Sequence, residues 1–122
     1  MNDVYFFDSY AVMEIIKGNP NYKKYLDKNV VLIKENIFEI YLSVLRQIDK
    51  EKANSIIDDY YPCVIDFDKD VIKEAAELKL RHYKQNISMT DCIGYILAMK
   101  LGIKFLTGDK EFEGFENVEF VK

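Results

Sequence analysis

Four carboxylate side chains occur where the chain is expected to leave a strand or to enter a helix. Asp8 directly follows a run of four apolar residues, and Asp109 lies three residues after another predicted strand. Asp91 falls in the first turn of a predicted helix, and Glu39 lies early in a different one. Ligands of open parallel sheets bind outside the carboxyl ends of the strands, so we expect these four carboxylates to gather there.

Carboxylates that crowd together repel one another, which raises their pKa values. A divalent cation relieves that repulsion, and a ligand set made only of oxygen suits Mg²⁺ or Mn²⁺ better than zinc. The pattern therefore predicts a binding site for a divalent cation.

Each carboxylate also has an ordinary structural explanation. Asp8 could cap the helix that follows it, and Asp109 could belong to a plain turn. Asp91 fits a capping-box-like pattern with the residues just before it, and Glu39 could lie on a solvated helix face. Glu35, one helical turn before Glu39, competes with it for the same role. The four ordinary explanations are weaker when taken together, because Asp8 and Asp91 both lie at the ends of apolar segments.

The elements that would position these residues alternate between strand and helix. Short apolar runs predict strands over residues 3–7, 30–33, 63–65, 103–106 and 118–121. Helical spacing of the apolar residues predicts a short helix or turn over 22–27 and helices over 9–17, 35–47, 51–60, 68–83 and 88–101. This alternation implies an α/β fold, a three-layer α/β/α sandwich with a central, mostly parallel sheet. The length predicts one domain over residues 1–122.

The composition excludes several classes of protein. Hydrophobic residues make up 49% of the chain and charged residues 31%, which fits neither a disordered nor a fibrous protein. No segment reaches the ~18 consecutive apolar residues that a membrane span needs. The first residues lack a basic region and Asp8 interrupts their apolar run, unlike a signal peptide. We therefore expect a cytoplasmic protein without a membrane partner.

Charge and cysteine content give weaker indications. Cys63 and Cys92 lie far apart with no histidine near them in sequence, which predicts two reduced core cysteines. A net charge of −4 and a pI of about 5.0 weigh against nucleic-acid binding through a basic face, although a bound metal would reverse the charge locally. The cations that could line an RNA path, or form an ordinary solvated surface, are Lys17, Lys23, Lys24, Arg46 and Lys50.

Four segments resemble, in order and in spacing, the motifs of the PIN-domain family. They are residues 6–10, 36–40, 90–93 and 106–112, and they extend over nearly the whole chain. The part that runs from the third segment through the fourth is the most specific, and the second segment is the least specific. The resemblance implies an acidic pocket formed by Asp8, Glu39, Asp91 and Asp109, with supporting hydroxyl groups from Ser9 and Thr107.

The resemblance also implies an activity and partners. PIN domains typically cleave RNA in a metal-dependent reaction, so this chain would be an endoribonuclease that uses Mg²⁺ or Mn²⁺. Many small members are the toxins of VapBC-type toxin–antitoxin pairs, which are inhibited by an antitoxin protein and are usually dimeric. The implied partners are therefore RNA as substrate, an antitoxin and a second copy of the chain.

Alternative readings remain open. A non-catalytic PIN-like domain could bind a partner or act as a scaffold, although all four acidic positions are occupied. A receiver-type signalling domain could use Asp66 as its phosphate acceptor, but Asp8 is followed by Ser9 instead of a second acid. A receiver domain would also carry a lysine at the end of its fifth strand, but here Thr107-Gly108-Asp109 occupies that kind of place. The same Asp8-Ser9-Tyr10 sequence lacks the Asp-x-Asp pattern of haloacid-dehalogenase-like phosphatases.

Overall fold

A computed structural model, which describes residues 3–122, shows a central sheet of four parallel strands. The strands are β1 (Val4–Phe7), β2 (Asn29–Val31), β3 (Lys104–Thr107) and β4 (Val118–Phe120). Their order across the sheet is β2-β1-β3-β4, and every pair of neighbours is parallel. Because β1 pairs with both β2 and β3, the two strands that precede Asp8 and Asp109 end side by side.

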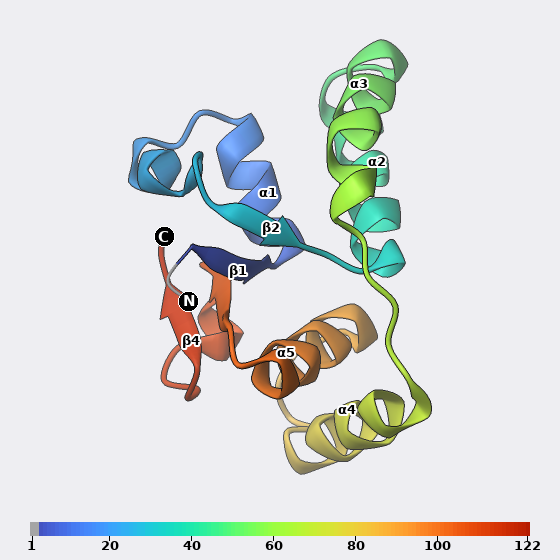
Figure 1. The fold of residues 1–122 in the computed structure, drawn as a ribbon, viewed down its shortest axis with the longest axis vertical. Coiled ribbons are helices and arrows are strands. Elements are labelled where there is room, and N and C mark those ends of the chain that lie inside the picture. The colour runs from blue at the N-terminus through green and yellow to red at the C-terminus, as the bar shows by residue number, and fades with distance from the viewer. Residues whose placement is uncertain (1–2) are drawn as a thin grey trace.

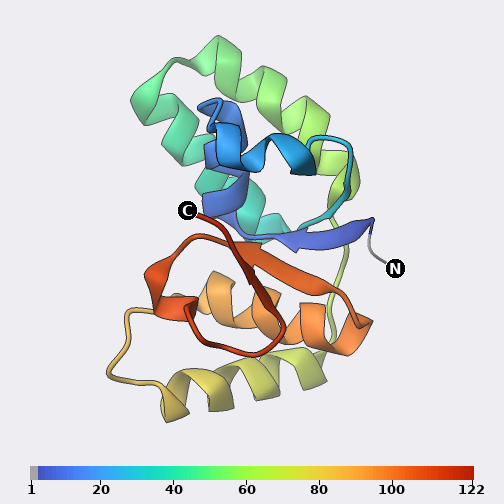
Figure 2. The ribbon, with the colours of Figure 1, turned by 90° about the vertical axis from the view of Figure 1, so that its left-hand side faces the viewer.

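Helices cover both faces of this sheet, as Figures 1 and 2 show. One face packs against α1 (Ser9–Ile16), α2 (Lys34–Gln47) and α3 (Lys50–Tyr60), and the other packs against α4 (Lys69–Arg81) and α5 (Met89–Leu101). Three short 3₁₀ helices, Pro20–Tyr25, Tyr61–Cys63 and Lys110–Phe112, complete the connections. The predicted three-layer α/β/α sandwich with a parallel sheet is confirmed.

The two faces of the sheet belong to separate hydrophobic clusters, because successive strand residues point to opposite sides. Phe6 packs toward α5 and stacks on Phe105 with ring centroids 5.6 Å apart. Phe7 and Leu106 belong to the cluster that includes α1. Gly94 in α5 makes the close packing possible, since a Cβ there would lie 2.6 Å from a ring carbon of Phe6. Both clusters therefore hold β1 and β3 together at the end where the acidic residues lie.

One predicted strand is wrong. Residues 63–65 form only an isolated parallel bridge, in which Val64 faces Leu32. Two backbone hydrogen bonds make it, from the Leu32 amide to the Cys63 carbonyl (3.1 Å) and from the Ile65 amide to the Leu32 carbonyl (2.9 Å). The preceding 3₁₀ helix, with Pro62 in its first turn, leaves no length of extended chain for a longer ladder. Within residues 3–122 the sheet accordingly has four strands instead of five.

The remaining boundaries differ from the predictions by at most a few residues. The short helix or turn expected at 22–27 is the 3₁₀ helix Pro20–Tyr25, which Asn19 caps by accepting a hydrogen bond from the Asn21 amide. In the described part of the chain, no helix is both long enough and apolar enough to span a membrane. The expectation about the N-terminal segment rests partly on Met1 and Asn2, which lie outside the described residues.

Candidate acidic site

Asp8 lies at the carboxyl end of β1 and is only 3% exposed. It occupies the N-cap position of α1, yet its side chain accepts no capping hydrogen bond. The carboxylate oxygen Oδ2 instead accepts a hydrogen bond of 2.7 Å from Oγ1 of Thr107, at the end of β3. The capping explanation for Asp8 is therefore wrong, and its side chain is directed into the site between the two strand ends.

Asp91 meets this carboxylate from the N-terminus of α5. Its Oδ2 accepts a hydrogen bond from the Ser88 amide (3.2 Å), and its own amide donates to Ser88 Oγ (3.1 Å), so the predicted capping box is present. The same carboxyl group lies close enough to Asp8 for its negative charge to raise the pKa of Asp8. Capping and membership of the acidic site are thus compatible functions of one side chain.

The pKa values of both carboxyl groups are raised. Burial is the largest cause that raises the pKa of Asp8 well above its ordinary value, and the negative charge of Asp91 raises it further. Burial also raises the pKa of Asp91, but the hydrogen bonds with Ser88 oppose the rise. Both groups therefore take up a proton more readily than an exposed aspartate does.

Glu39 joins the cluster from the first half of α2 through a chain of polar contacts. Ser9 Oγ donates to Glu39 Oε1 at 2.7 Å, and Asn36 Nδ2 donates to Ser9 Oγ at 2.9 Å. Asn36 in turn accepts a hydrogen bond of 3.0 Å from the Ile33 amide. Burial raises the pKa of Glu39, the Ser9 bond opposes that rise, and the charge of Asp91 adds to it. The electrostatic coupling places Glu39 in the same site as Asp91.

Asn36 is a member of this network that the sequence analysis missed. Its side chain is only 1% exposed, and buried amide groups are normally hydrogen-bonded. Its two hydrogen bonds link the start of α2 to Ser9. The available signal was its position in the first turn of a helix that follows an apolar run, where Asn can bond the chain entering the helix.

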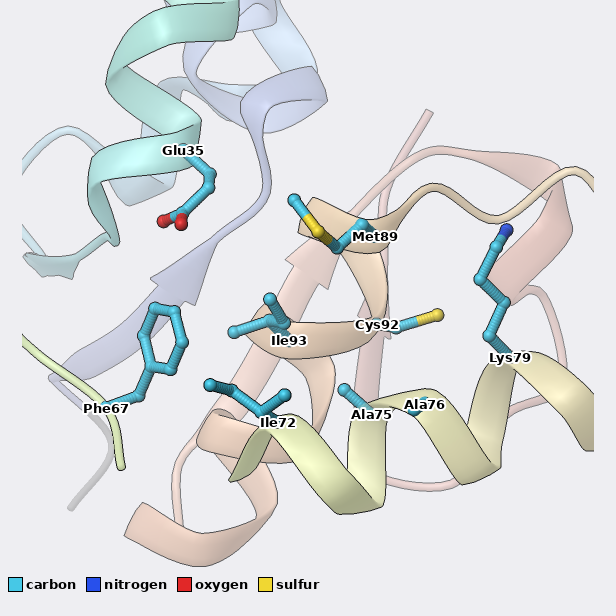
Figure 3. A pocket seen from close by; sticks show the side chains of 9 residues that line it. All are labelled: Glu35, Phe67, Ile72, Ala75, Ala76, Lys79, Met89, Cys92 and Ile93. Atoms are coloured by element: carbon cyan, nitrogen blue, oxygen red, sulfur yellow. The ribbon is translucent and has the colours of Figure 1, made fainter. Parts of the chain in front are cut away.

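Glu35 does not take the place of Glu39. Figure 3 shows its side chain directed from α2 toward an apolar pocket between α2, α4 and α5. The pocket has a volume of about 330 Å³, and Oε1 of Glu35 is buried without a hydrogen-bond partner among the described residues. The charge of Glu35 reaches the site only indirectly, as a minor cause that raises the pKa of Glu39. The other residues that line the pocket are Phe67, Ile72, Ala75, Ala76, Lys79, Met89, Cys92 and Ile93.

Asp109 stands at the edge of the cluster. Its amide donates to Thr107 Oγ1 (3.0 Å) and its Oδ1 accepts from the Glu111 amide (3.0 Å), so the turn explanation is correct. Its negative charge nevertheless raises the pKa of Asp91. Gly108 gives the turn its shape, because a Cβ there would lie 2.2 Å from the Val121 carbonyl oxygen. Asp109 thus acts on the site through charge and shares Thr107 with Asp8.

The structure therefore brings Asp8, Glu39 and Asp91 together and leaves Asp109 beside them. Over residues 3–122, no three acidic, histidine or cysteine side chains already stand in an arrangement that would hold a metal ion. The donor set itself fits a hard divalent cation, since it consists of oxygen atoms on mutually repelling carboxyl groups. A bound cation would relieve the repulsion through which the charge of Asp91 raises the pKa of Asp8.

Comparison with known proteins agrees with the fold. The family model of the PIN domain matches residues 5–118, and the chain belongs to the PIN-domain family. Among curated proteins, none matches the sequence significantly.

Solved structures share the fold at low sequence identity. A toxin–antitoxin complex from Klebsiella pneumoniae has a TM-score of 0.74 and 14% identity, covering 94% of this chain and 95% of that one. VapBC2 from Rickettsia felis, bound to a DNA fragment from its promoter, has a TM-score of 0.71 and 18% identity over 98% and 99%. VapC20 from Mycobacterium tuberculosis, described as a toxin that cleaves the Sarcin-Ricin loop, has a TM-score of 0.68 and 18% identity over 94% and 98%.

Proposed function

We propose that this chain is a metal-dependent endoribonuclease that hydrolyses RNA phosphodiester bonds. The observation that carries the proposal is that Asp91 lies beside the buried Asp8 at the carboxyl end of a parallel sheet, where its charge raises the pKa of Asp8. Carboxyl groups that crowd together in this way suit a cation site better than a structural role. Membership of the PIN-domain family supports the same reaction.

In this proposal Asp8, Glu39, Asp91 and Asp109 hold Mg²⁺ or Mn²⁺. The bound cation supplies charge neutralisation at the phosphate and an activated water. Thr107 positions Asp8 through its hydrogen bond, and Ser9 positions Glu39 in the same way. Both hydroxyl groups stabilise the charged form of their carboxylate, which is the form that binds a cation.

The proposal assigns the chain to the toxins of VapBC-type pairs. Three structures of the same fold support it, because two are described as toxin–antitoxin or VapBC assemblies and the third as a cleaving toxin. The partner would then be an antitoxin protein, and the proposed location is the cytoplasm. The proposal also treats residues 1–122 as one PIN-like domain.

A second copy of the chain is part of the proposal. Ile72 and Met89 line the apolar pocket of Figure 3 and are 50% and 59% exposed. Large apolar side chains exposed around a hollow are typical of protein–protein contacts. Sedimentation of the purified chain at micromolar concentration tests this part, and a protein that stays monomeric there contradicts it.

The nuclease proposal is tested by incubating a mixed RNA pool with purified protein and Mg²⁺, Mn²⁺ or EDTA. Asp8→Asn and Asp91→Asn serve as the inactive variants, and Glu35→Gln serves as the matched acidic control on α2. We expect cleavage that requires the metal, disappears in both Asn variants and persists in the control. A folded wild-type chain that binds neither metal nor RNA would instead favour the non-catalytic binding domain.

A further inference from the structure

A groove of about 420 Å³ between α1 and α2 begins at the acidic site and leads away from it. Ser9 and Glu39 line its first part and are also members of the acidic cluster. The groove continues along both helices to Lys17, just after the end of α1, and to Arg46, in the last turn of α2. One end of the groove is therefore acidic, and the other carries two cations together with Glu14, which is paired with Lys17.

The two cations are available to a ligand. Within residues 3–122 the Arg46 guanidinium makes no ion pair or hydrogen bond, and it projects from an exposed position. Lys17 has a single weak partner, Glu14, at 3.5 Å. An ammonium group has three donors, so Lys17 keeps two of them free. Lysine and arginine at helix ends often stabilise the helix dipole, but here both also face one groove.

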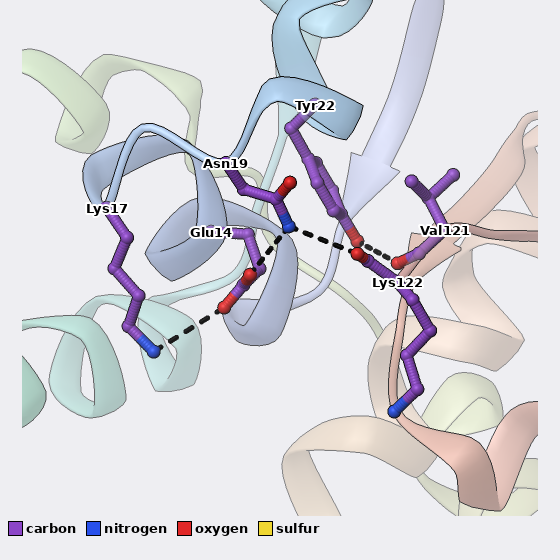
Figure 4. A network of polar contacts seen from close by, with 6 residues as sticks. All are labelled: Glu14, Lys17, Asn19, Tyr22, Val121 and Lys122. Carbon is purple, nitrogen blue, oxygen red and sulfur yellow. Dashed lines mark hydrogen bonds and ion pairs between the residues drawn. The ribbon is translucent and has the colours of Figure 1, made fainter.

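Lys17 adjoins a polar network centred on Glu14 and Asn19, as Figure 4 shows. Glu14 receives the ion pair from Lys17 through one carboxylate oxygen and a hydrogen bond of 2.8 Å from Asn19 through the other. Asn19 also donates to the Lys122 carbonyl oxygen at 3.1 Å, which ties this corner to the C-terminal segment. The carboxylate of Glu14 is consequently engaged on both sides and does not cancel the charge of Lys17 completely.

The length of the helices fixes which phosphate these cations could reach. At 1.5 Å per residue, Lys17 lies roughly 12 Å along α1 from Ser9, and Arg46 lies roughly 10 Å along α2 from Glu39. The phosphate being cleaved would lie at the acidic end, whereas both cations lie toward the other end of the groove. A neighbouring phosphate of the same strand, which follows the groove, is within their reach.

We infer that the α1–α2 groove binds single-stranded RNA, with a flanking phosphate of the substrate held by Arg46 and Lys17. The inference rests on the proposed nuclease function, because that function places the phosphate being cleaved at the acidic end of the groove. A polyanion with regularly spaced charges fits both ends once a metal occupies the acidic one. The other occupant, an acidic segment of a protein partner, would need only the cationic end.

The test is binding of a fluorescent single-stranded RNA of mixed sequence to the Asp8→Asn chain in Mg²⁺ at several salt concentrations. Each phosphate contact on a single strand contributes about 0.7 to the slope of log K against log salt concentration. Because both cations hold one phosphate, we expect Arg46→Ala with Lys17→Ala to lower the slope by roughly 0.7 and to weaken binding at low salt. The charge-matched control, Lys69→Ala with Lys73→Ala on exposed positions of α4, should leave the slope unchanged.

In the chain with Asp8 restored, the same pair of groove substitutions should raise KM for RNA and leave kcat nearly unchanged. A slope that stays the same, or that falls equally in the α4 control, overturns the inference, as does a chain that binds no RNA. If those substitutions spare RNA binding but weaken binding of a co-purifying protein, the groove belongs to that partner. If the wild type cleaves RNA but the groove substitutions leave the salt slope unaltered, only the groove inference is refuted. If those substitutions lower the salt slope but the wild type cleaves no RNA, the nuclease proposal is refuted.

Discussion

Thr107 Oγ1 donates a hydrogen bond of 2.7 Å to Asp8 Oδ2, although 99 residues separate the two in sequence. The same hydroxyl oxygen accepts a hydrogen bond of 3.0 Å from the Asp109 amide. One side chain at the end of β3 therefore lowers the pKa of the most buried carboxyl group and at the same time shapes the turn that carries another. The consequences of this double contact can be measured.

Replacement of Thr107 by Val keeps the shape of the side chain and removes its hydroxyl group. Asp8 then loses the hydrogen bond that opposes the rise of its pKa, and the Asp109 amide loses its acceptor. We expect a loss of about 1–3 kcal/mol in unfolding free energy and an activity profile shifted to higher pH. Urea denaturation measures the unfolding free energy, and RNA cleavage over a range of pH measures the activity profile. Thr107→Ser keeps the hydroxyl group and should retain most of the stability and most of the wild-type pH profile.

The acidic cluster should make the metal-free chain less stable as the pH rises. An unfolded Asp titrates near 3.9, whereas burial and the charge of Asp91 raise the pKa of folded Asp8. Between these two pKa values the native state binds more protons than the unfolded state, so stability falls with increasing pH and then levels off. Asp8→Asn should therefore stabilise the chain at pH 7 but not below pH ~3.9. Thermal unfolding in EDTA over that pH range measures this effect. A difference in stability between the wild type and Asp8→Asn that does not change with pH would contradict the prediction.

A divalent cation should reverse this destabilisation. A ligand that binds only the native state at 100 times its Kd adds about 2.7 kcal/mol to the unfolding free energy. We expect Mg²⁺ or Mn²⁺ to raise the melting temperature of the wild type and of Glu35→Gln. The same ions should have little effect on Asp91→Asn, which loses a carboxylate of the cluster. An equal shift in all three proteins, seen by scanning calorimetry, would mean that the ions bind elsewhere.

Gly108 should tolerate no side chain. An added Cβ would lie 2.2 Å from the Val121 carbonyl oxygen and 2.4 Å from a ring carbon of Tyr10, and neither backbone nor packed ring can move freely. We expect Gly108→Ala to cost about 1–3 kcal/mol, as overpacking usually does, and to reduce activity further by displacing Asp109. Denaturation and cleavage assays on the same preparation separate the two effects. Activity equal to that of the wild type in a folded variant would show that the Asp109 turn is unimportant.

The sequence by itself determined much of the local structure. The run Val4–Phe7 and the helical spacing of α5 predict a buried strand and a helix, because apolar periodicity decides which residues leave water. The order of strands and helices also predicted the parallel sheet, and with it the strand end where Asp8 lies. A three-residue apolar run such as 63–65 carries too little pattern to separate a strand from a single bridge, so that prediction failed.

Only the tertiary structure decided which polar groups meet. Glu35 and Glu39 stand one turn apart on α2 and look alike in sequence. Packing of α2 against α1 brings Glu39 to Ser9, whereas Glu35 faces the apolar pocket beside α4 and α5. The contact of Thr107 with Asp8 likewise depends on the pairing of β1 with β3, a contact between distant parts of the chain. Local sequence patterns contain no information on such pairings, because the hydrogen bonds form only once the two hydrophobic clusters have brought the strands together.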